Sequence, residues 1–524
     1  MSNIEKLADH RRQGKQVAQA QRLIDEGTSA ELFRSASGET FARVPVSGHA
    51  EVHPIRSRAF REWLQWRYFN EHGRGPSTNA MQEAIETLHA RARFDGDAHE
   101  VHLRIAEREG TIYIDLGDPQ WRVIQIVPGV GWGVIKTAPV RFRRAKGMLP
   151  LPMPVESGHV DELRGFLNVG DDDGWRLALG GILSALRPSG PFPVVAYHGE
   201  QGAAKTTTAR ITRELIDPNV SSSRAEPRDV RDLMIAAKNG WLLSFDNLST
   251  IPGWLSDTFC RLSTGGGFAT RALYTDDDEI LFDSQRPIIV NGIEEIVTRG
   301  DLLSRSLLIE LPSIGDEARR PEADLWREFH SASGRILGGL LDVVAMALAV
   351  EPNVQLERLP RMADFARWMV AVEKVMSWPE GSFLATYETN RSQANDLAVD
   401  ASLIAAPIRS MVDAAPFEGT AGELLERLTD FTEDQTRRRR GWPTTARGLA
   451  GQLRRLSPNL RAIGYSVEFE REGRERRRVY RIQRVPDPTV PTVPTVRASV
   501  NPADGADGAD GADGVLQAAL ELQS

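Results

Sequence analysis

The chain has 524 residues, enough for about two to four domains, and its 41% hydrophobic and 26% charged residues are typical of a soluble globular protein. Its single cysteine, Cys260, excludes an intrachain disulfide and a cysteine-rich zinc site. The net charge of −8 argues against a nucleic-acid partner, but residues 437–484 hold 15 Arg and four Glu, without Lys or Asp, so positive charge is concentrated there.

The first 150 residues predict an α+β accessory domain. Residues 1 to about 40 predict charged helix, and aromatic residues at helical spacing in 60–69 predict a second helix. A Ser-Thr capping signal predicts a third helix over 79–93. Short apolar runs predict strands at 101–107, 111–116 and 121–127. Asp115 and Asp118 lie near a strand end, where an acid in a turn is several times commoner than a primase metal site.

Residues 151–320 predict a parallel α/β domain, because apolar runs alternate there with helical patterns. Three strand candidates each end in a polar residue: 193–198, 240–246 and 286–291. The carboxyl ends of parallel strands share one edge of a sheet, so we expect ligand-binding groups at that edge.

The remaining segments are helical, basic and low in complexity, in that order. Residues 321–400 predict helices, and within them the apolar stretch 336–350 predicts a buried helix, since it contains Asp342 and is too short for a bilayer. Residues 401–485 predict a basic domain. The Val-Pro-Thr and Ala-Asp-Gly repeats of 486–524 predict a disordered tail. The chain begins without the pattern of a signal peptide, so we expect a cytoplasmic protein.

The sharpest local signal follows the first strand candidate. Residues 199–206 spell GEQGAAKT, which nearly matches the P-loop signature, with Ala204 at the usual place of the last glycine. In such a loop, backbone N–H groups point at phosphate oxygens, and the next helix adds positive potential. Lys205 is expected on the β- and γ-phosphates of ATP, and Thr206 on Mg²⁺. The predicted nucleotide contacts are Gly199, Gly202, Ala203, Ala204, Lys205, Thr206 and Thr207.

A P-loop requires a carboxylate on a neighbouring strand to hold the magnesium shell. Asp246 ends the second strand candidate and is predicted in that role, whereas without a P-loop it would be an acid in a turn. Asn247 follows where many ATPases carry a Glu that polarises the attacking water. An amide orients water but accepts no proton. Either hydrolysis is slow, or another acid, such as Asp257 or Glu200, assists.

The third strand candidate and the segment after it supply three further candidates. Asn291 is predicted to bridge the γ-phosphate and the attacking water, although an Asn before a Gly also caps turns. Arg305 is predicted as an arginine finger, which stabilises charge on the transferring phosphate of the ATP bound by a neighbouring subunit, and Arg299 is the less favoured choice. A single surface arginine usually has no such role.

Five motifs occur in this order within about 177–312: GEQGAAKT, LLSFDN, LSTGGGFATRALYTDDDEILF, RPIIVNG and DLLSRSLLIELP. They resemble superfamily 3 helicase domains, most strongly the phage and plasmid primase-helicase branch, which is related to the AAA+ ATPases. The resemblance implies a ring, expected as a hexamer, with ATP between subunits. It also implies that the third motif forms a β-hairpin in the ring channel, with Arg271 and Tyr274 facing single-stranded DNA. Ala204 and Asn247 depart from the family pattern, and Asn247 bears on hydrolysis rate rather than nucleotide binding.

The arginine-rich segment predicts a helix after Thr420, a second helix after Thr445 and a two-stranded hairpin, an order that fits a winged helix. A charge run is usually a solvated face, but this concentration of charge favours contact with nucleic acid. The arginines expected to contact phosphates are Arg437, Arg438, Arg439, Arg440, Arg454, Arg455, Arg476, Arg477 and Arg478.

The sequence therefore predicts an α/β protein with a P-loop AAA+-like core, an N-terminal α+β domain and a C-terminal winged helix. The predicted function is an ATP- and Mg²⁺-dependent DNA helicase or replication protein of phage or mobile-element type, working as a homo-oligomer and without a membrane partner. One alternative is a nucleotide-gated DNA-binding protein with slow turnover, which Asn247 favours. A weaker alternative adds primase activity in the N-terminal domain.

Overall fold

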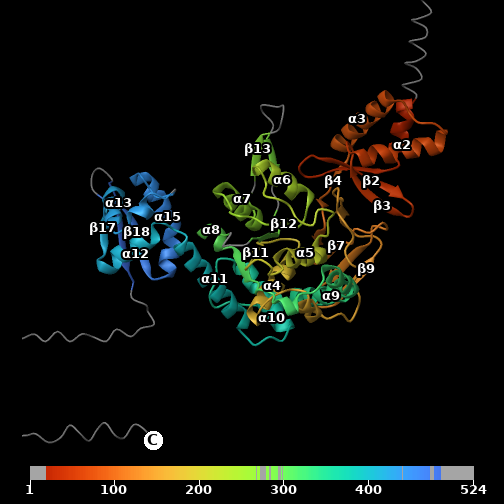
Figure 1. Ribbon diagram of the computed structural model, residues 1–524. Coiled ribbons are helices and arrows are strands. Elements are labelled where there is room, and N and C mark those ends of the chain that lie inside the picture. Colours follow the sequence, from red (N-terminus) through yellow and green to blue (C-terminus); the bar gives the residue numbers. More distant parts are fainter. Residues whose placement is uncertain are drawn as a thin grey trace, which may run out of the picture. The chain divides into compact units, whose positions relative to one another are not determined.

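A computed structural model describes residues 19–485 except 267, 272–278, 283–284, 293–296, 298, 440 and 473–476. Residues 268–271, 279–282, 471–472 and 477 are described by their backbone alone. Figure 1 traces the chain from an N-terminal α+β region through a central α/β region to a small C-terminal region of helices and strands.

The N-terminal region packs two helices on a four-stranded sheet. The helices are α2 (Arg58–His72) and α3 (Thr78–Phe94), which begin after the N-caps Ser57 and Ser77, and both match their predictions closely. The sheet has the order β3-β2-β1-β4, in which β1–β3 are antiparallel and β4 is parallel to β1. These strands are β1 (Glu31–Arg34), β2 (Thr40–Val46), β3 (His49–Pro54) and β4 (Asp97–Ala98).

The predicted helix over residues 1 to about 40 is wrong from Glu31 onward, because β1 occupies that place. Residues 40–46, TFARVPV, form the neighbouring strand β2, in which the buried Ala42 and Val44 alternate with the more exposed Arg43 and Pro45. Residues 1–18 lie outside the described part of the chain.

A second antiparallel sheet follows, with the order β6-β7-β8-β9. Its strands are β6 (Ile105–Arg108), β7 (Thr111–Asp115), β8 (Val123–Val127) and β9 (Gly131–Ile135), and a separate parallel pair joins β5 (Val101–His102) to β10 (Arg141–Phe142). The inward side chains of this sheet, among them Ile112, Ile114 and Ile124, lie in the same hydrophobic core as the central helices. The domain boundary near residue 150 stays a prediction, but the core itself crosses it.

The central sheet is wholly parallel and has the order β12-β15-β11-β16. Its strands are β11 (Val194–His198), β12 (Leu243–Phe245), β15 (Ile288–Asn291) and β16 (Ser306–Glu310). The first three match the predicted strands, and β16 was not predicted as a strand. Between β12 and β15 the chain forms an antiparallel backbone pair, β13 (Phe268–Arg271) with β14 (Glu279–Phe282).

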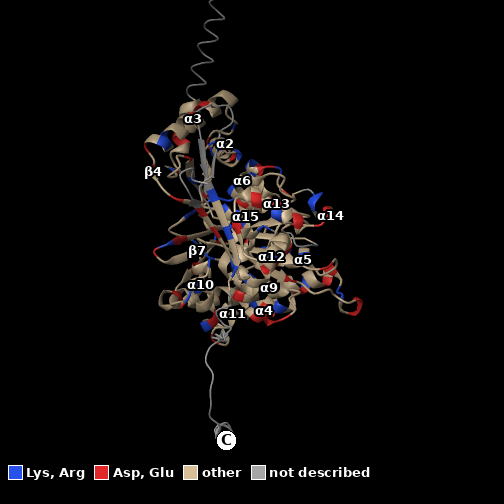
Figure 2. Cartoon of the chain, turned by 90° about the vertical axis from the view of Figure 1, so that its left-hand side faces the viewer, with Lys and Arg blue, Asp and Glu red and all other residues tan. Residues whose placement is uncertain are grey.

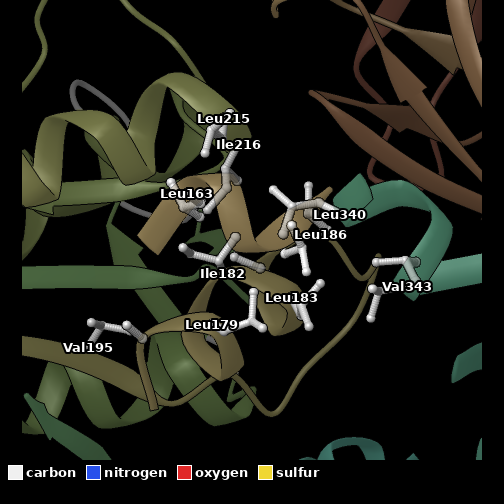
Figure 3. Packing of buried hydrophobic residues seen from close by; sticks show 14 of the residues in the cluster. Leu163, Leu179, Ile182, Leu183, Leu186, Val195, Leu215, Ile216, Leu340 and Val343 are labelled. Carbon is white, nitrogen blue, oxygen red and sulfur yellow. The ribbon is translucent and has the colours of Figure 1, made fainter. Parts of the chain in front are cut away.

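Helices cover both faces of this sheet. On one face lie α4 (Asp172–Ala185) and α5 (Lys205–Ile216), and on the other α6 (Val230–Asn239) and α7 (Gly253–Thr264). Figure 3 shows the hydrophobic core on the face covered by α4 and α5, where Leu179, Ile182 and Leu183 of α4 lie among side chains of β11, α5 and α9. The sheet is therefore buried on both sides, as its continuous apolar strands predict.

The helical segment after the sheet contains α9 (Glu322–Val350), α10 (Ala363–Val375), α11 (Ser382–Asp400) and α12 (Ala405–Ala414). In the described part of the chain, one helix, Glu322–Asn353, is long and apolar enough to cross a membrane, but 61% of its most apolar window is buried in the protein. A Cβ added to Gly338 would lie 1.9 Å from the carbonyl oxygen of Val155, so the chain packs directly on the backbone of α9. The predicted buried helix is confirmed.

The C-terminal region packs helices against a three-stranded sheet of order β17-β19-β18. Its elements are β17 (Phe417–Gly419), α13 (Ala421–Asp430), α14 (Asp434–Arg437), α15 (Ala446–Ala462), β18 (Tyr465–Glu472) and β19 (Arg477–Arg484). Thr420 and Glu423 form a capping box at the start of α13, and Thr445 caps α15. The predicted order of two helices and a hairpin is present, with β17 and the short α14 in addition.

Candidate nucleotide site

The candidate site lies at the carboxyl edge of the central sheet, in the loop between β11 and α5. Gly199 and Gly202 have φ angles of 142° and 88°, which favour glycine. A Cβ on Gly199 would lie 2.3 Å from the carbonyl oxygen of Leu311, so the loop also needs glycine for close approach. Ala204 has a φ of 58°, which is the left-handed conformation. This conformation costs alanine more free energy than it costs the glycine that usually stands at this place in a P-loop. Ala204 caps α5 without a side-chain hydrogen bond, which leaves N–H groups at the helix start for an anion.

Lys205 and Thr206 lie at the beginning of α5. The Nζ atom of Lys205 donates to the carbonyl oxygens of Gly199 at 2.8 Å and Glu200 at 2.7 Å, so the side chain folds back over the loop. Desolvation lowers the pKa of the Lys205 ammonium, and an anionic ligand beside it would favour the charged form. The hydroxyl of Thr206 donates to a carboxylate oxygen of Asp246 at 2.9 Å.

Asp246 and Asn247 follow β12 directly, and each is held by a hydrogen bond from its backbone N–H. The N–H of Asp246 donates to the carbonyl of Arg224 at 3.1 Å, beside an isolated parallel bridge between Arg224 and Phe245. Asn247 has a φ of 55°, and its N–H donates to the side-chain oxygen of Asn291 at 2.8 Å. The turn after β12 is therefore fixed by groups from neighbouring segments.

Asn291 ends β15, the strand between β11 and β12, and its side chain is 2% exposed. Its amide nitrogen is buried and has no hydrogen-bond partner among the residues that the structure describes. A buried unpaired donor costs about 1–3 kcal/mol. Such a donor, at the end of the strand that pairs with β12, fits a site that a ligand completes.

Two residues near the loop were not predicted from the sequence. The amide nitrogen of Asn168, before α4, donates to the carbonyl oxygens of Ala203 at 3.0 Å and Pro312 at 2.7 Å, and so ties the loop to the end of β16. A guanidinium nitrogen of Arg319 lies 3.7 Å from the place of a Cβ on Gly202. Neither residue belongs to a recognisable motif, so only the fold reveals them.

The donor groups at this edge fit Mg²⁺ better than a transition metal. Thr206 and Asp246 offer one hydroxyl and one carboxylate, the hard oxygen ligands that Mg²⁺ accepts together with phosphates and water. Within the described residues no group of three or more His, Cys, Asp or Glu side chains is placed to hold a metal ion. Asp115 and Asp118 are paired with Arg144 at 2.7 Å and Arg122 at 2.5 Å, so these carboxylates are already neutralised.

Arg305 lies at the opposite edge of the sheet from the loop. Its carbonyl accepts from the N–H of Val194 at 2.9 Å, at the start of β11, whereas Gly199 follows the end of that strand. Five residues of strand at about 3.3 Å each separate the two ends by roughly 16 Å. Arg299 is engaged differently, because it forms an ion pair with Asp257 at 2.9 Å and donates to the carbonyl of Gly253. Asp257, one of the acids suggested to assist hydrolysis, is therefore committed to Arg299.

The predicted DNA contacts are partly described. Tyr274, Arg440 and Arg476 lie outside the described residues, as do the side chains of Arg271 and Arg477. Arg438, Arg439, Arg454 and Arg478 are exposed, and Arg437 is paired with Asp434. Acidic and basic residues intermix around α13 and α14 (Figure 2).

Arg455 takes a different place from the other arginines of α15. It lines a cavity of about 220 Å³ together with Arg299, Asp301 and Asn459, so it faces the segment around α8 (Gly300–Leu303).

Comparison with known proteins bears on both the central and the C-terminal regions. Residues 160–399 match the family model of the actinomycete integrative conjugative element replication protein. Residues 404–496 match the model of the C-terminal domain of the same replication protein, RepA. The chain resembles a mobile-element replication protein. No curated protein matches it significantly.

Solved structures show weaker likeness. The apo C-terminal region of NrS-1 is 12% identical, with 89% of this chain and 99% of that chain covered and a TM-score of 0.37. The structure titled "SCCmec type IV Cch - active helicase" is 12% identical, with 87% and 92% covered and a TM-score of 0.42. TM-scores this low do not establish a shared fold.

Proposed function

We propose that this RepA-like chain is an ATP-dependent DNA helicase or replication motor of superfamily 3 type, with ATP and Mg²⁺ bound at the β11–α5 loop. The observation that supports the proposal is the convergence of three strand ends: the loop after β11, Asp246 after β12 and Asn291 at the end of β15. The 2.9 Å contact between Thr206 and Asp246 pairs the two proposed magnesium-side groups.

Each residue at this edge has a proposed task. The loop N–H groups and Lys205 bind the phosphates, and Thr206 and Asp246 hold Mg²⁺, which when bound neutralises phosphate charge. Asn291 holds the turn at Asn247 through its oxygen and offers its unpaired N–H₂ to a phosphate oxygen or to water. Because Arg305 is about 16 Å from its own loop along β11, it is assigned to the nucleotide of a neighbouring copy, which makes the motor a homo-oligomer, expected as a hexamer.

DNA is the proposed substrate of this motor. The β13–β14 pair is inserted between β12, which Asp246 follows, and β15, which ends in Asn291, so its movement can follow events at the nucleotide. The C-terminal region is proposed as a winged helix, with exposed Arg438, Arg439 and Arg454 on the DNA backbone. The match of this region to a replication-protein domain supports the assignment.

The decisive experiment measures ATP turnover with and without single-stranded DNA, together with displacement of an annealed strand. Wild-type protein is expected to hydrolyse ATP faster with DNA and to displace the strand, and Lys205→Ala is expected to abolish both. ATP binding and turnover that survive in Lys205→Ala would refute the assignment of the loop.

One observation favours the slow-turnover alternative. Asn247 presents an amide after Asp246, and its backbone is fixed by Asn291, so no carboxylate occupies that place. Under this alternative, ATP binding alone alters DNA affinity. It predicts a nucleotide-dependent change in DNA binding without strand displacement.

A further inference from the structure

A second arginine, Arg361, lies near Arg305 at the amino edge of the central sheet. Arg305 donates through Nη1 to the carbonyl of Asp301 at 2.9 Å and contacts the sulfur of Cys260 at 3.6 Å. Arg361, from the segment before α10, has a guanidinium nitrogen 4.0 Å from the carboxylate of the same Asp301. Two segments that are far apart in the sequence thus bring two guanidinium groups to one place.

The charges at this place do not balance. A third arginine, Arg391 of α11, lies near enough for its charge to act on Arg361. In the described part of the chain, Arg305 and Arg391 have no carboxylate within 4.0 Å, and Arg361 has Asp301 at the limit of that distance. Burial lowers the pKa of Arg361, and the positive charges of Arg305 and Arg391 lower it further. Like charges are held together here with one carboxylate to offset them, an arrangement that an anion would stabilise.

A neighbouring arginine shows what a structural role looks like in the same region. Arg299 forms a close ion pair with Asp257 at 2.9 Å and also donates to a carbonyl, and its side chain is 29% exposed. Among the described residues Arg361 has no such close partner, and its side chain is 37% exposed. Arg361 is therefore accessible and keeps donors free for a ligand outside the chain.

We propose that Arg361 is a second arginine that acts with Arg305 on the γ-phosphate of ATP bound by a neighbouring copy of this chain. This role rests on the proposed ATPase function. In the reaction, the oxygen of a water molecule bonds to the γ-phosphorus while the bond from that phosphorus to the β–γ bridging oxygen breaks. The products are ADP and dihydrogen phosphate, which carries both protons of the water and exchanges them with the solvent. Both guanidinium groups stay protonated and stabilise the negative charge that develops, so neither moves a proton.

Two experiments on the full-length chain test the proposal, and the first measures the ATP turnover of single variants. Arg361→Ala is expected to lower ATP turnover by about 10²-fold, a typical loss for one transition-state donor, with little change in ATP binding. Arg361→Lys is expected to recover part of the loss, and melting curves check the folding of both variants. Arg358→Ala, which removes an exposed arginine three residues earlier, serves as the matched control and should keep wild-type turnover.

Mixing variants separates an action on the neighbouring copy from an action within the chain. Lys205→Ala protein lacks a working loop but keeps its arginines, whereas Arg361→Ala protein keeps its loop. If Arg361 acts on the neighbouring copy, mixing the two impaired proteins gives more turnover than the sum of the separate proteins, as mixing Lys205→Ala with Arg305→Ala also should.

Each outcome of the mixing experiment decides the inference. Restoration with Arg305→Ala but not with Arg361→Ala overturns the role of Arg361 and leaves the proposed function standing. Unchanged turnover in Arg361→Ala does the same. Absence of restoration in both mixtures, or of turnover in the wild type, refutes the proposed intersubunit site itself.

Discussion

Replacing Arg104 with Met should destabilise the protein more than any change at an exposed arginine. Arg104 is fully buried and donates to Asp217 at 3.0 Å and to the carbonyls of Asp115, Leu149 and Pro218 at 3.1, 2.9 and 3.4 Å. It thereby joins the β6–β9 sheet to the end of α5.

The magnitude follows from the groups that Arg104→Met leaves behind. The Asp217 carboxylate would stay buried, with hydrogen bonds from the N–H groups of Trp241 and Leu242 as its remaining support. Breaking one side of a buried ion pair costs about 3–5 kcal/mol. Because these two N–H groups remain, we expect the loss to lie near the lower end, at about 3 kcal/mol.

Urea unfolding followed by tryptophan fluorescence measures this free energy, with Arg108→Ala as the control. Arg108 ends β6, the strand that begins directly after Arg104. It pairs with Glu109 and donates to the carbonyl of Pro139, its side chain is 54% exposed, and its loss should cost at most about 1 kcal/mol. If both variants unfold at the same urea concentration, Arg104 does not hold the sheet to α5 as argued.

Three further predictions concern magnesium, DNA and pH. Thr206→Ala should require a roughly 10-fold higher Mg²⁺ concentration for half-maximal turnover, and an unchanged Mg²⁺ titration would contradict its proposed contact with the ion. Arg454→Ala should reduce the slope of log affinity for DNA against log salt by about 1, so an identical slope would make it a solvated surface residue. Burial lowers the pKa of His102 below its usual 6.5, so the unfolded chain takes up a proton more readily and stability is lost as pH falls below about 6.5. His102→Gln should therefore show a smaller drop in urea midpoint between pH 7 and pH 5.5, and an equal drop would show that His102 does not cause it.

The sequence predicted the elements with strong local signals. Thr420 and Thr445 mark helix starts because their hydroxyls cap the helices within the same few residues. The strands before Asp246 and up to Asn291 are short apolar runs, and the polar residues at their ends meet because all strands of this sheet run parallel. Glycine spacing located the loop for the same local reason.

What the sequence could not predict depends on contacts between distant residues. Asn168 ties the loop to Pro312, and nothing within its own segment marks it. Arg361 meets Arg305 only after the chain has passed through α9, and the register of β16 against β11 places Arg305 away from its own loop. The strands of 31–54 were missed because a charged N-terminal stretch was extended too far as helix.

The shared core of the β6–β9 sheet sets a lower limit on any shortened form of this protein. Ile112, Ile114 and Ile124 are at most 1% exposed and pack with the helices that support the nucleotide loop. A fragment that starts at residue 151 would lack this sheet, so the apolar side chains of those helices would be exposed to water. Each fully buried side chain of this size contributes about 1.5–3 kcal/mol to the free energy of unfolding. The smallest fragment that folds should therefore start near residue 100, well ahead of the first motif of the nucleotide site.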